Sequence, residues 1–199
     1  MHNIIAISGK LRHGKNTLAD DVNKLIREHE LDYYRLAFAD PVKEIATIMF
    51  PQIPTLWLYG SSEFRDNVVE GTVNQKTGRA FTVRDILLKI GAMGRECNKD
   101  VWIMATADKI EKTINSYCDG VIITDCRYRN EMAYLKKEQI PIIRVIREGL
   151  DITSDDPSEI DLDGVDLKEF DMVIVNKELD DLKNAAKQIV ERYILGKGR

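Results

Sequence analysis

The sequence of 199 residues predicts a three-layer α/β fold with a central, mainly parallel sheet and helices on both faces. Two observations lead to this prediction. Short apolar runs alternate along the chain with longer segments of helical period, which is typical of parallel sheets. In addition, the run at 121–124 is continuously apolar up to its final threonine. Such a run is expected of a strand whose two faces are both covered.

The strands and helices are expected in alternating order. A strand at 4–8 leads into a helix whose apolar face carries Leu18, Val22 and Ile26. Pro41 opens a helix at a position where proline is tolerated, and Thr82 caps another. The expected strands are 4–8, 33–38, 121–124, 142–146 and 172–175. The expected helices are 15–29, 41–49, 83–90, 100–117, 129–139 and 179–195.

Two long segments lack a regular period. Segment 51–79 is interrupted by prolines and glycines, so we expect an irregular insertion with a short hairpin around 72–81. Segment 148–170 is polar and acidic, and we expect a lid-like loop there. No internal repeat divides the chain, so we expect 1–199 to be a single domain with 51–81 as an insertion.

The composition limits the classes of partner. With 44% apolar and 31% charged residues and a net charge of −4, the chain is not a general nucleic-acid binder, which needs a basic surface. A mononucleotide site needs only a few convergent cations. No apolar run has the length of a membrane span, and we expect no signal peptide. Cys97, Cys118 and Cys126 lack metal-like spacing, so we expect reduced thiols. Reduced thiols fit a cytoplasmic protein, and the cytoplasm would be that of a host if the protein is viral.

The strongest motif follows the first strand. Gly9 and Gly14 bracket four residues, Lys15 comes next, and the hydroxyl of Thr17 follows two positions later. Glycines let backbone N–H groups face one anion, and a helix that starts at the lysine adds its positive end. The pattern predicts the phosphate-binding loop of a P-loop nucleotide enzyme, in which Lys15 reaches the β- and γ-phosphates and Thr17 contacts a phosphate.

Asn16 departs from the usual pattern, which has Ser or Thr there as a direct magnesium ligand. An asparagine followed by threonine favours a nucleoside monophosphate kinase over a GTPase. Loop positions between the glycines usually point outward, so we expect no chemical role for His13, although Arg12 and His13 add positive potential near phosphate.

Asp125 ends the apolar strand at 121–124, at the sheet edge where ligands bind in parallel sheets. A carboxylate there can hold magnesium through water, although a helix cap is the alternative. Arg127 beside it can clamp a phosphate. Arg129 and Glu131 can instead be a solvated helix start.

Other candidates carry weaker signals. Asp40 and Lys43 follow the second strand, and from spacing alone Lys43 is an exposed lysine. Phosphoryl transfer gains rate from positive charge around the moving group, so some of the arginines over 65–95 should converge on the site. These are Arg65, Arg79, Arg84 and Arg95, of which Arg84 and Arg95 are preferred. Trp102 and Tyr128 are candidate stacking surfaces for a base, and core or rim packing explains them equally well.

With these segments assembled, the chain resembles the bacteriophage-type deoxynucleoside monophosphate kinases. The matching stretches are 8–17, 36–43, 83–91, 100–102, 124–131, 144–147 and 173–176, in the order of the family. The resemblance implies a P-loop kinase fold and transfer of the γ-phosphate of ATP to a deoxynucleoside monophosphate, with magnesium. The chain is shorter than these kinases after its second strand, where base and sugar selection is expected, so no substrate preference is carried over.

Together, the residues and the resemblance give a set of expected site residues. ATP is expected at Gly9, Arg12, Gly14, Lys15, Asn16, Thr17 and Arg147, with the 153–159 stretch near the donor. The acceptor is expected at Asp40, Val42, Lys43, Arg65, Arg84, Arg95, Trp102, Asp125, Arg127 and Glu131, shaped by the insertion 51–81. Lys15, Arg84, Asp125 and Arg127 are expected to be catalytic, and Asp125 (through water) and Thr17 to hold magnesium.

Three functions remain open at this point. The first is a deoxynucleoside monophosphate kinase that acts by in-line transfer without a protein base. The second is a P-loop kinase of another small metabolite, of the phosphomevalonate or dephospho-coenzyme A type. The third is a module that hydrolyses a nucleoside triphosphate slowly and signals to a partner. The expected partners are small nucleotides, and the amphipathic helix at 179–195 can pack on the sheet or on a second copy in a homodimer.

Overall fold

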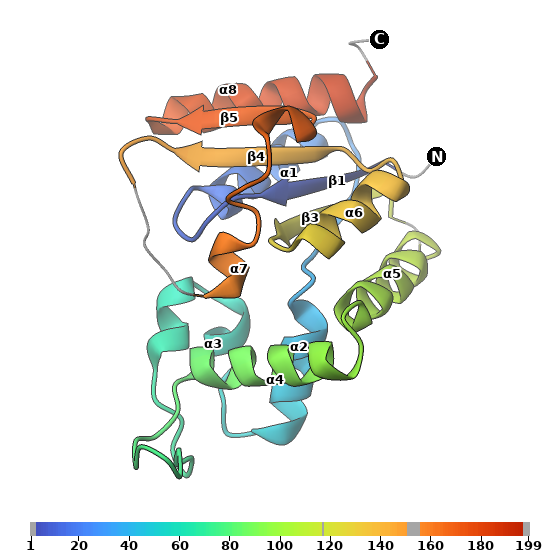
Figure 1. Cartoon of the computed structure of the whole chain (residues 1–199). Helices are drawn as coiled ribbons and strands as arrows, with labels where there is room; N and C mark the ends of the chain where they lie inside the picture. The colour runs from blue at the N-terminus through green and yellow to red at the C-terminus, as the bar shows by residue number, and fades with distance from the viewer. Residues whose placement is uncertain (1–2, 117, 151–155, 197–199) are drawn as a thin grey trace. The chain divides into compact units, whose positions relative to one another are not determined.

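The computed structural model describes residues 3–116, 118–150 and 156–196, and it divides into two compact units. Unit 1 consists of Met1–Phe38 and Ala107–Arg199, and unit 2 consists of Ala39–Thr106. Figure 1 shows the order of the elements along the chain. In the described ranges, none of the helices is both long and apolar enough to cross a membrane.

Unit 1 contains a five-stranded parallel sheet in the order β2-β3-β1-β4-β5. Its strands are β1 (Asn3–Ser8), β2 (Tyr33–Leu36), β3 (Gly120–Cys126), β4 (Ile142–Arg147) and β5 (Met172–Asn176). All five strands expected from the sequence are present, and the predicted parallel α/β architecture is confirmed.

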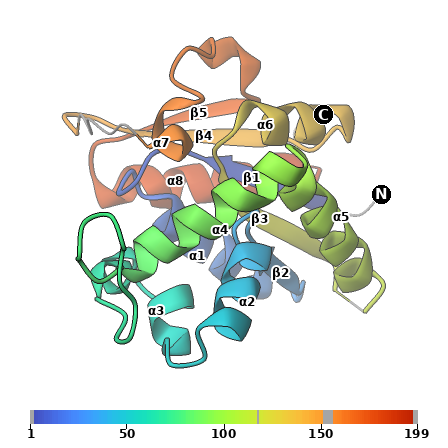
Figure 2. The same ribbon diagram turned by 60° about the horizontal axis from the view of Figure 1, so that its bottom comes forward.

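Helices cover both faces of this sheet. On one face lie α1 (Lys15–Glu28) and α8 (Leu179–Ile189), which continues into the π-helical turn η3 (Val190–Ile194). On the other face lies α6 (Arg129–Lys137), as Figures 1 and 2 both show. The expected lid-like segment contains only the short α7 (Pro157–Ile160) and η2 (Leu167–Glu169).

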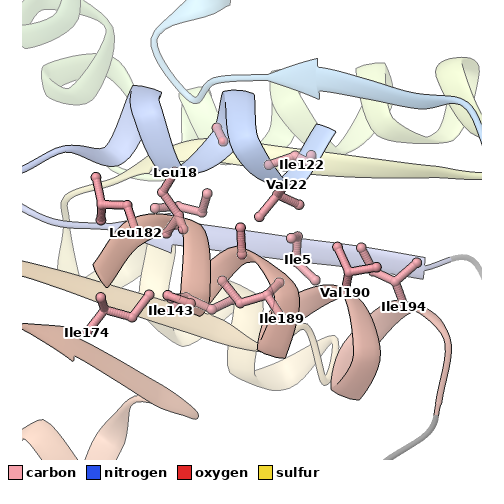
Figure 3. Packing of buried hydrophobic residues seen from close by; sticks show 14 of the residues in the cluster. Ile5, Leu18, Val22, Ile122, Ile143, Ile174, Leu182, Ile189, Val190 and Ile194 are labelled. Atoms are coloured by element: carbon pink, nitrogen blue, oxygen red, sulfur yellow. The ribbon is translucent and has the colours of Figure 1, made fainter. Parts of the chain in front are cut away.

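The main core of unit 1 lies between the sheet and the α1–α8 face (Figure 3). Leu18, Val22 and Ile26 recur at helical spacing on α1 and are fully buried. They pack with Leu182 and Ile189 of α8 and with isoleucines of β1, β3 and β4. Because α1 is held rigidly by this core, its first residue, Lys15, is held in place as well.

Unit 2 contains α2 (Asp40–Met49), α3 (Thr55–Tyr59), the 3-10 helix η1 (Ser62–Asp66), α4 (Val83–Cys97) and the start of α5 (Val101–Ile114). Helices α2 and α4 lie side by side in Figure 2 and share an apolar core. Thr82 caps α4 as expected, in a reciprocal capping box with Asp85.

Two expectations for segment 51–81 are wrong. The segment is not uniformly irregular, since it contains α3 and η1. The hairpin around 72–81 is also not formed as regular strands: the described residues there contain no strand. A backbone hydrogen bond from Asn74 to the Arg79 carbonyl closes the loop, and one antiparallel bridge joins Val68 and Thr82 at its base. The reason is local. The Thr72 hydroxyl accepts the Phe81 N–H and donates to the Val69 carbonyl, so a side chain takes the bonds that a strand ladder would use.

The three cysteines form no disulfide with one another and differ in burial. Cys97 on α4 is exposed, Cys118 is half-buried and Cys126 at the end of β3 is buried. Burial raises the pKa of the Cys126 thiol well above its ordinary value.

Candidate active site

The glycine-rich loop joins β1 to α1 and is pressed against the ends of β4 and β5. Gly14 has a left-handed backbone with φ of 100°, and a Cβ there would lie 2.7 Å from Nδ2 of Asn176. A Cβ on Gly9 would lie 2.6 Å from the Val145 carbonyl oxygen. Both positions therefore require glycine, which gives the pattern found in the sequence a structural reason.

Two side chains hold the loop from beneath. Nδ2 of Asn176 donates to the His13 carbonyl at 3.0 Å. Nδ1 of His13 lies 3.3 Å from both the Val145 carbonyl oxygen and the Arg147 nitrogen. The expectation that His13 points outward is wrong, because its side chain is buried against polar groups at the end of β4. This burial lowers the pKa of His13.

Lys15 starts α1 and is buried inside the loop. Its Nζ donates to the Lys10 carbonyl at 2.6 Å. Burial and the charge of Arg127 together lower the pKa of Lys15 to about 7, against the opposing effect of Glu159 and Asp125. A desolvated ammonium that faces other cations gains strongly from an incoming anion.

A carboxylate of the segment after β4 lies against the loop. Glu159 on α7 accepts the Leu11 N–H at 2.8 Å and pairs with the guanidinium of Arg127. Asp163 pairs with Lys10 at 2.8 Å. The loop N–H and Arg127 thus already hold an anionic group, which is the behaviour expected of a phosphate-binding site.

The end of β3 supplies further charged side chains. Asp125 accepts the Phe38 N–H at 2.6 Å. Glu131, on the first turn of α6, accepts the N–H groups of Arg127 at 2.7 Å and Tyr128 at 3.0 Å, so it caps that helix. Burial raises the pKa of Glu131 to about 8, helped by the charge of Asp125.

The structure thus gathers one set of expected residues in unit 1. Arg147 donates to the Arg12 carbonyl at 3.5 Å, and Asn16 and Thr17 are exposed at the start of α1. Of the stretch 153–159 expected near the donor, residues 153–155 lie outside the described residues. The gathered set is Gly9, Arg12, Gly14, Lys15, Asn16, Thr17, Asp125, Arg127, Glu131 and Arg147.

A second set belongs to unit 2. Lys43 is buried rather than exposed, pairs with Asp40 at 2.8 Å and lies 5.0 Å from the ring centre of Tyr59. Arg84 binds Asp66 at 2.9 Å. Trp102 is buried and donates its ring N–H to the Gly91 carbonyl at 2.9 Å. Val42 lies in the apolar core, Arg65 and Arg95 are half-buried, and Arg79 is exposed. The acceptor roles of this set stay predictions.

Three polar residues around the loop were not named as site residues from the sequence: Ser8, Arg144 and Asn176. Glu159 lies in the stretch 153–159 that was expected near the donor, but it was not singled out there. Ser8 and Arg144 lie within strand patterns, where a buried polar residue carries no periodic signal. Glu159 falls in a segment without a period, so its approach to the loop depends on the tertiary fold. Asn176 alone had a signal, since it ends the last strand at the ligand edge of the sheet.

A parallel sheet with a glycine loop and a buried lysine between β1 and α1 defines a P-loop kinase fold. A family model described as deoxynucleotide monophosphate kinase matches residues 58–186, well over half of the chain. The chain belongs to this family and is a phosphotransferase. The matched residues do not include the phosphate loop, so loop and family match are independent observations.

Several solved structures are similar over nearly their whole length. Shikimate kinase from Acinetobacter baumannii in complex with shikimate is 11% identical, with coverage of 99% of this chain and 96% of that chain and a TM-score of 0.43. A sugar kinase from Janibacter sp. is 14% identical, with coverage of 96% and 95% and a TM-score of 0.43. Shikimate kinase from Bacteroides thetaiotaomicron is 9% identical, with coverage of 95% and 97% and a TM-score of 0.41. These similarities are too distant to say anything about the substrate. No match was found among curated proteins.

Proposed function

We propose that the protein transfers the γ-phosphate of ATP to a deoxynucleoside monophosphate, which gives the diphosphate and ADP. The family match supports a nucleotide acceptor. One observation supports ATP as the phosphate donor: Lys15 is buried within a loop whose Leu11 N–H already binds a carboxylate. Nucleotides are then the partners of this chain. A phage origin, a cytoplasmic location and a homodimer remain predictions.

The donor phosphates bind to the loop in this proposal. Backbone N–H groups of the loop and the positive end of α1 surround them, and Lys15 neutralises the β- and γ-oxygens. Glu159 leaves the Leu11 N–H when the phosphates arrive, because two anions cannot share that donor. The segment 148–170, which carries Glu159, acts as a lid in this proposal, because its carboxylate leaves the loop when the donor phosphates bind.

Magnesium fits the residues at the end of β3. Among the described residues, no three His, Cys, Asp or Glu side chains are arranged to hold a metal ion by themselves. Magnesium that binds with a nucleotide needs only one or two protein carboxylates, since phosphates and water complete its shell. The Asp125 carboxylate, through water, and the Thr17 hydroxyl are the oxygen ligands we assign to it. When bound, it neutralises charge on the phosphate oxygens.

The acceptor is a phosphate monoester, which is already an anionic nucleophile. The protein therefore needs no general base, and its task is to position the acceptor and to balance charge. We assign Arg84 and Arg127 to the transferred group. Further acceptor contacts come from Asp40, Lys43, Arg65, Arg95, Trp102 and Glu131, with 51–81 shaping the base and sugar site.

The test is chromatographic measurement of ATP consumption against a panel of monophosphates at one ATP concentration, with magnesium. Diphosphate formed from dGMP, dTMP or dCMP supports the proposal. Transfer only to a non-nucleotide acceptor contradicts the acceptor class. Phosphate release without any acceptor indicates a hydrolysing module instead.

A further inference from the structure

Three lysine or arginine side chains are buried in the part of the chain that the structure describes: Lys15, Lys43 and Arg144. Lys43 has its own carboxylate, Asp40, at 2.8 Å. Neither Lys15 nor Arg144 has a carboxylate within ion-pair distance among the described residues. Lys15 belongs to the phosphate loop, so the question concerns Arg144, for which the proposed mechanism has no role.

Arg144 lies directly beneath the start of the phosphate loop. In the β1–β4 register it is the partner of Ser8, the residue before Gly9. Its Nη1 donates to the Ser8 hydroxyl at 2.9 Å, and that hydroxyl donates to the Cys126 carbonyl at 2.8 Å. One guanidinium thereby links the ends of β4, β1 and β3. These are the strand ends from which the loop, Asp125 and Arg127 emerge.

The remaining surroundings of Arg144 do not balance its charge. The guanidinium lies 5.4 Å from the ring centre of Phe170, which offers only a weak cation–π contact. Burial lowers the pKa of Arg144 by more than the charges of Asp163 and Glu159 raise it, and the charge of Arg127 adds to the lowering. Burying a charge without a partner costs free energy. A bound anion near Arg144 would reduce that cost, which the carboxylates of the free protein reduce only in part.

The local balance of charge identifies that anion. Lys10 and Arg127 have their carboxylates, Asp163 and Glu159, whereas Lys15 and Arg144 have none at ion-pair distance. Two buried cations beneath one loop match a ligand with several negative charges close together. A single carboxylate would leave one of them unbalanced. A linear polyphosphate, such as the tail of a nucleoside triphosphate, has the required charge density.

We propose that Arg144 is a positioning residue of the phosphate loop, and that its charge is balanced by the polyphosphate tail of the bound donor. It holds the loop through Ser8 and attracts the tail through space. This inference rests on the proposed function, because it assumes that the loop binds a donor phosphate chain.

Three variants of the full chain test the inference. Arg144→Met removes the charge and keeps the length of the side chain, and Arg144→Lys restores the charge. A lysine also suffices for the single bond to Ser8, since no two-point contact is made. The control is Arg27→Met, the same substitution in the last turn of α1, about 18 Å along the helix from Lys15. Calorimetric titration with inorganic tripolyphosphate and with ATP gives the affinities, and thermal unfolding reports the fold.

Arg144→Met should weaken binding of both ligands on the order of tenfold, because a charge that acts through space without direct contact with the phosphates is lost. Arg144→Lys should stay within about threefold of the unmodified protein, and Arg27→Met should not differ from it. In the kinase assay, Arg144→Met should raise KM for ATP more than it lowers kcat, because the charge acts on bound donor and transition state alike.

Unchanged tripolyphosphate binding in folded Arg144→Met protein would overturn the inference and leave the proposed function standing. Failure of Arg144→Lys to restore binding would also overturn it. If Arg144→Met does not fold, Arg144→Gln, which keeps a donor for Ser8, replaces it, and unfolding of both neutral variants would assign Arg144 to stability alone. Absence of ATP binding by the unmodified protein would instead contradict the proposed function.

Discussion

The carboxylate of Glu159 accepts a hydrogen bond of 2.8 Å from the backbone N–H of Leu11, inside the phosphate loop. The two residues are far apart in sequence and belong to different segments of the chain. Leu11 lies where we propose that donor phosphate binds, and Glu159 lies on the short helix α7. The Glu159 carboxylate therefore uses a backbone donor of the loop that a donor phosphate would need.

Glu159→Gln should strengthen nucleotide binding. The amide still fits the space but no longer competes as an anion for Leu11 and Arg127, and hydrogen bonds to charged groups are the strong ones. We expect Kd for ADP and ATP to fall about tenfold. Calorimetric titration measures this, with Glu169→Gln as control, because Glu169 makes an exposed ion pair with Lys136 away from the loop. Weaker binding in Glu159→Gln would show that Glu159 supports the nucleotide site.

Lys15→Met should abolish turnover by several powers of ten and leave the fold intact. Lys15 is buried and its pKa is lowered to about 7, so the free protein loses no favourable ion pair when the charge is removed. The melting temperature should stay the same or rise. The control is Lys24→Met, an exposed lysine on the same helix. Near-normal turnover in Lys15→Met would refute the assignment of the loop.

Gly14→Ala should destroy phosphate binding. Its left-handed backbone is costly for alanine, and the added Cβ would lie 2.7 Å from the Asn176 amide that holds the loop. Gly71→Ala is a matched control, since Gly71 also has a positive φ, of 77°, but no atom within 4 Å of the added Cβ. Both variants should lose about 1 kcal/mol of stability from the backbone alone. Only Gly14→Ala should lose ATP binding, which a nucleotide-dependent shift in melting temperature detects.

The stability of the free protein should fall with rising pH because of Glu131. Its pKa is raised from 4.5 to about 8 in the folded state, so the folded protein keeps a proton that the unfolded chain releases. The stabilisation is therefore complete below pH 4.5 and is lost as the pH rises towards 8, by at most about 1.4 kcal/mol per pH unit. Denaturant unfolding of Glu131→Gln across this range should lack that decline. The amide oxygen still caps α6, so an identical decline in both proteins would exclude Glu131 as its source.

The sequence was sufficient to predict those features that depend on residues close together along the chain. The five strands follow from short apolar runs, and the loop follows from two glycines whose absent Cβ atoms the structure explains. Thr82 could be placed as a helix cap because capping depends on residues within one turn, and the structure adds Asp85 as its partner.

The sequence was insufficient where a side chain meets a segment distant along the chain. His13 was expected to point outward, yet the end of β4 provides polar partners for it. The Thr72 hydroxyl replaced the expected hairpin bonds. Arg144 is also of this kind, because its partner Ser8 lies more than a hundred residues away.

The three cysteines differ so much in accessibility that the chain carries a ready attachment point for a spectroscopic reporter. Cys126 is sealed in the interior and has a raised thiol pKa, and Cys118 is half-covered, so a maleimide dye should modify Cys97 first. Because Cys97 is on α4, a fluorophore there would monitor the helical unit of the kinase through its working cycle without any engineering of the polypeptide.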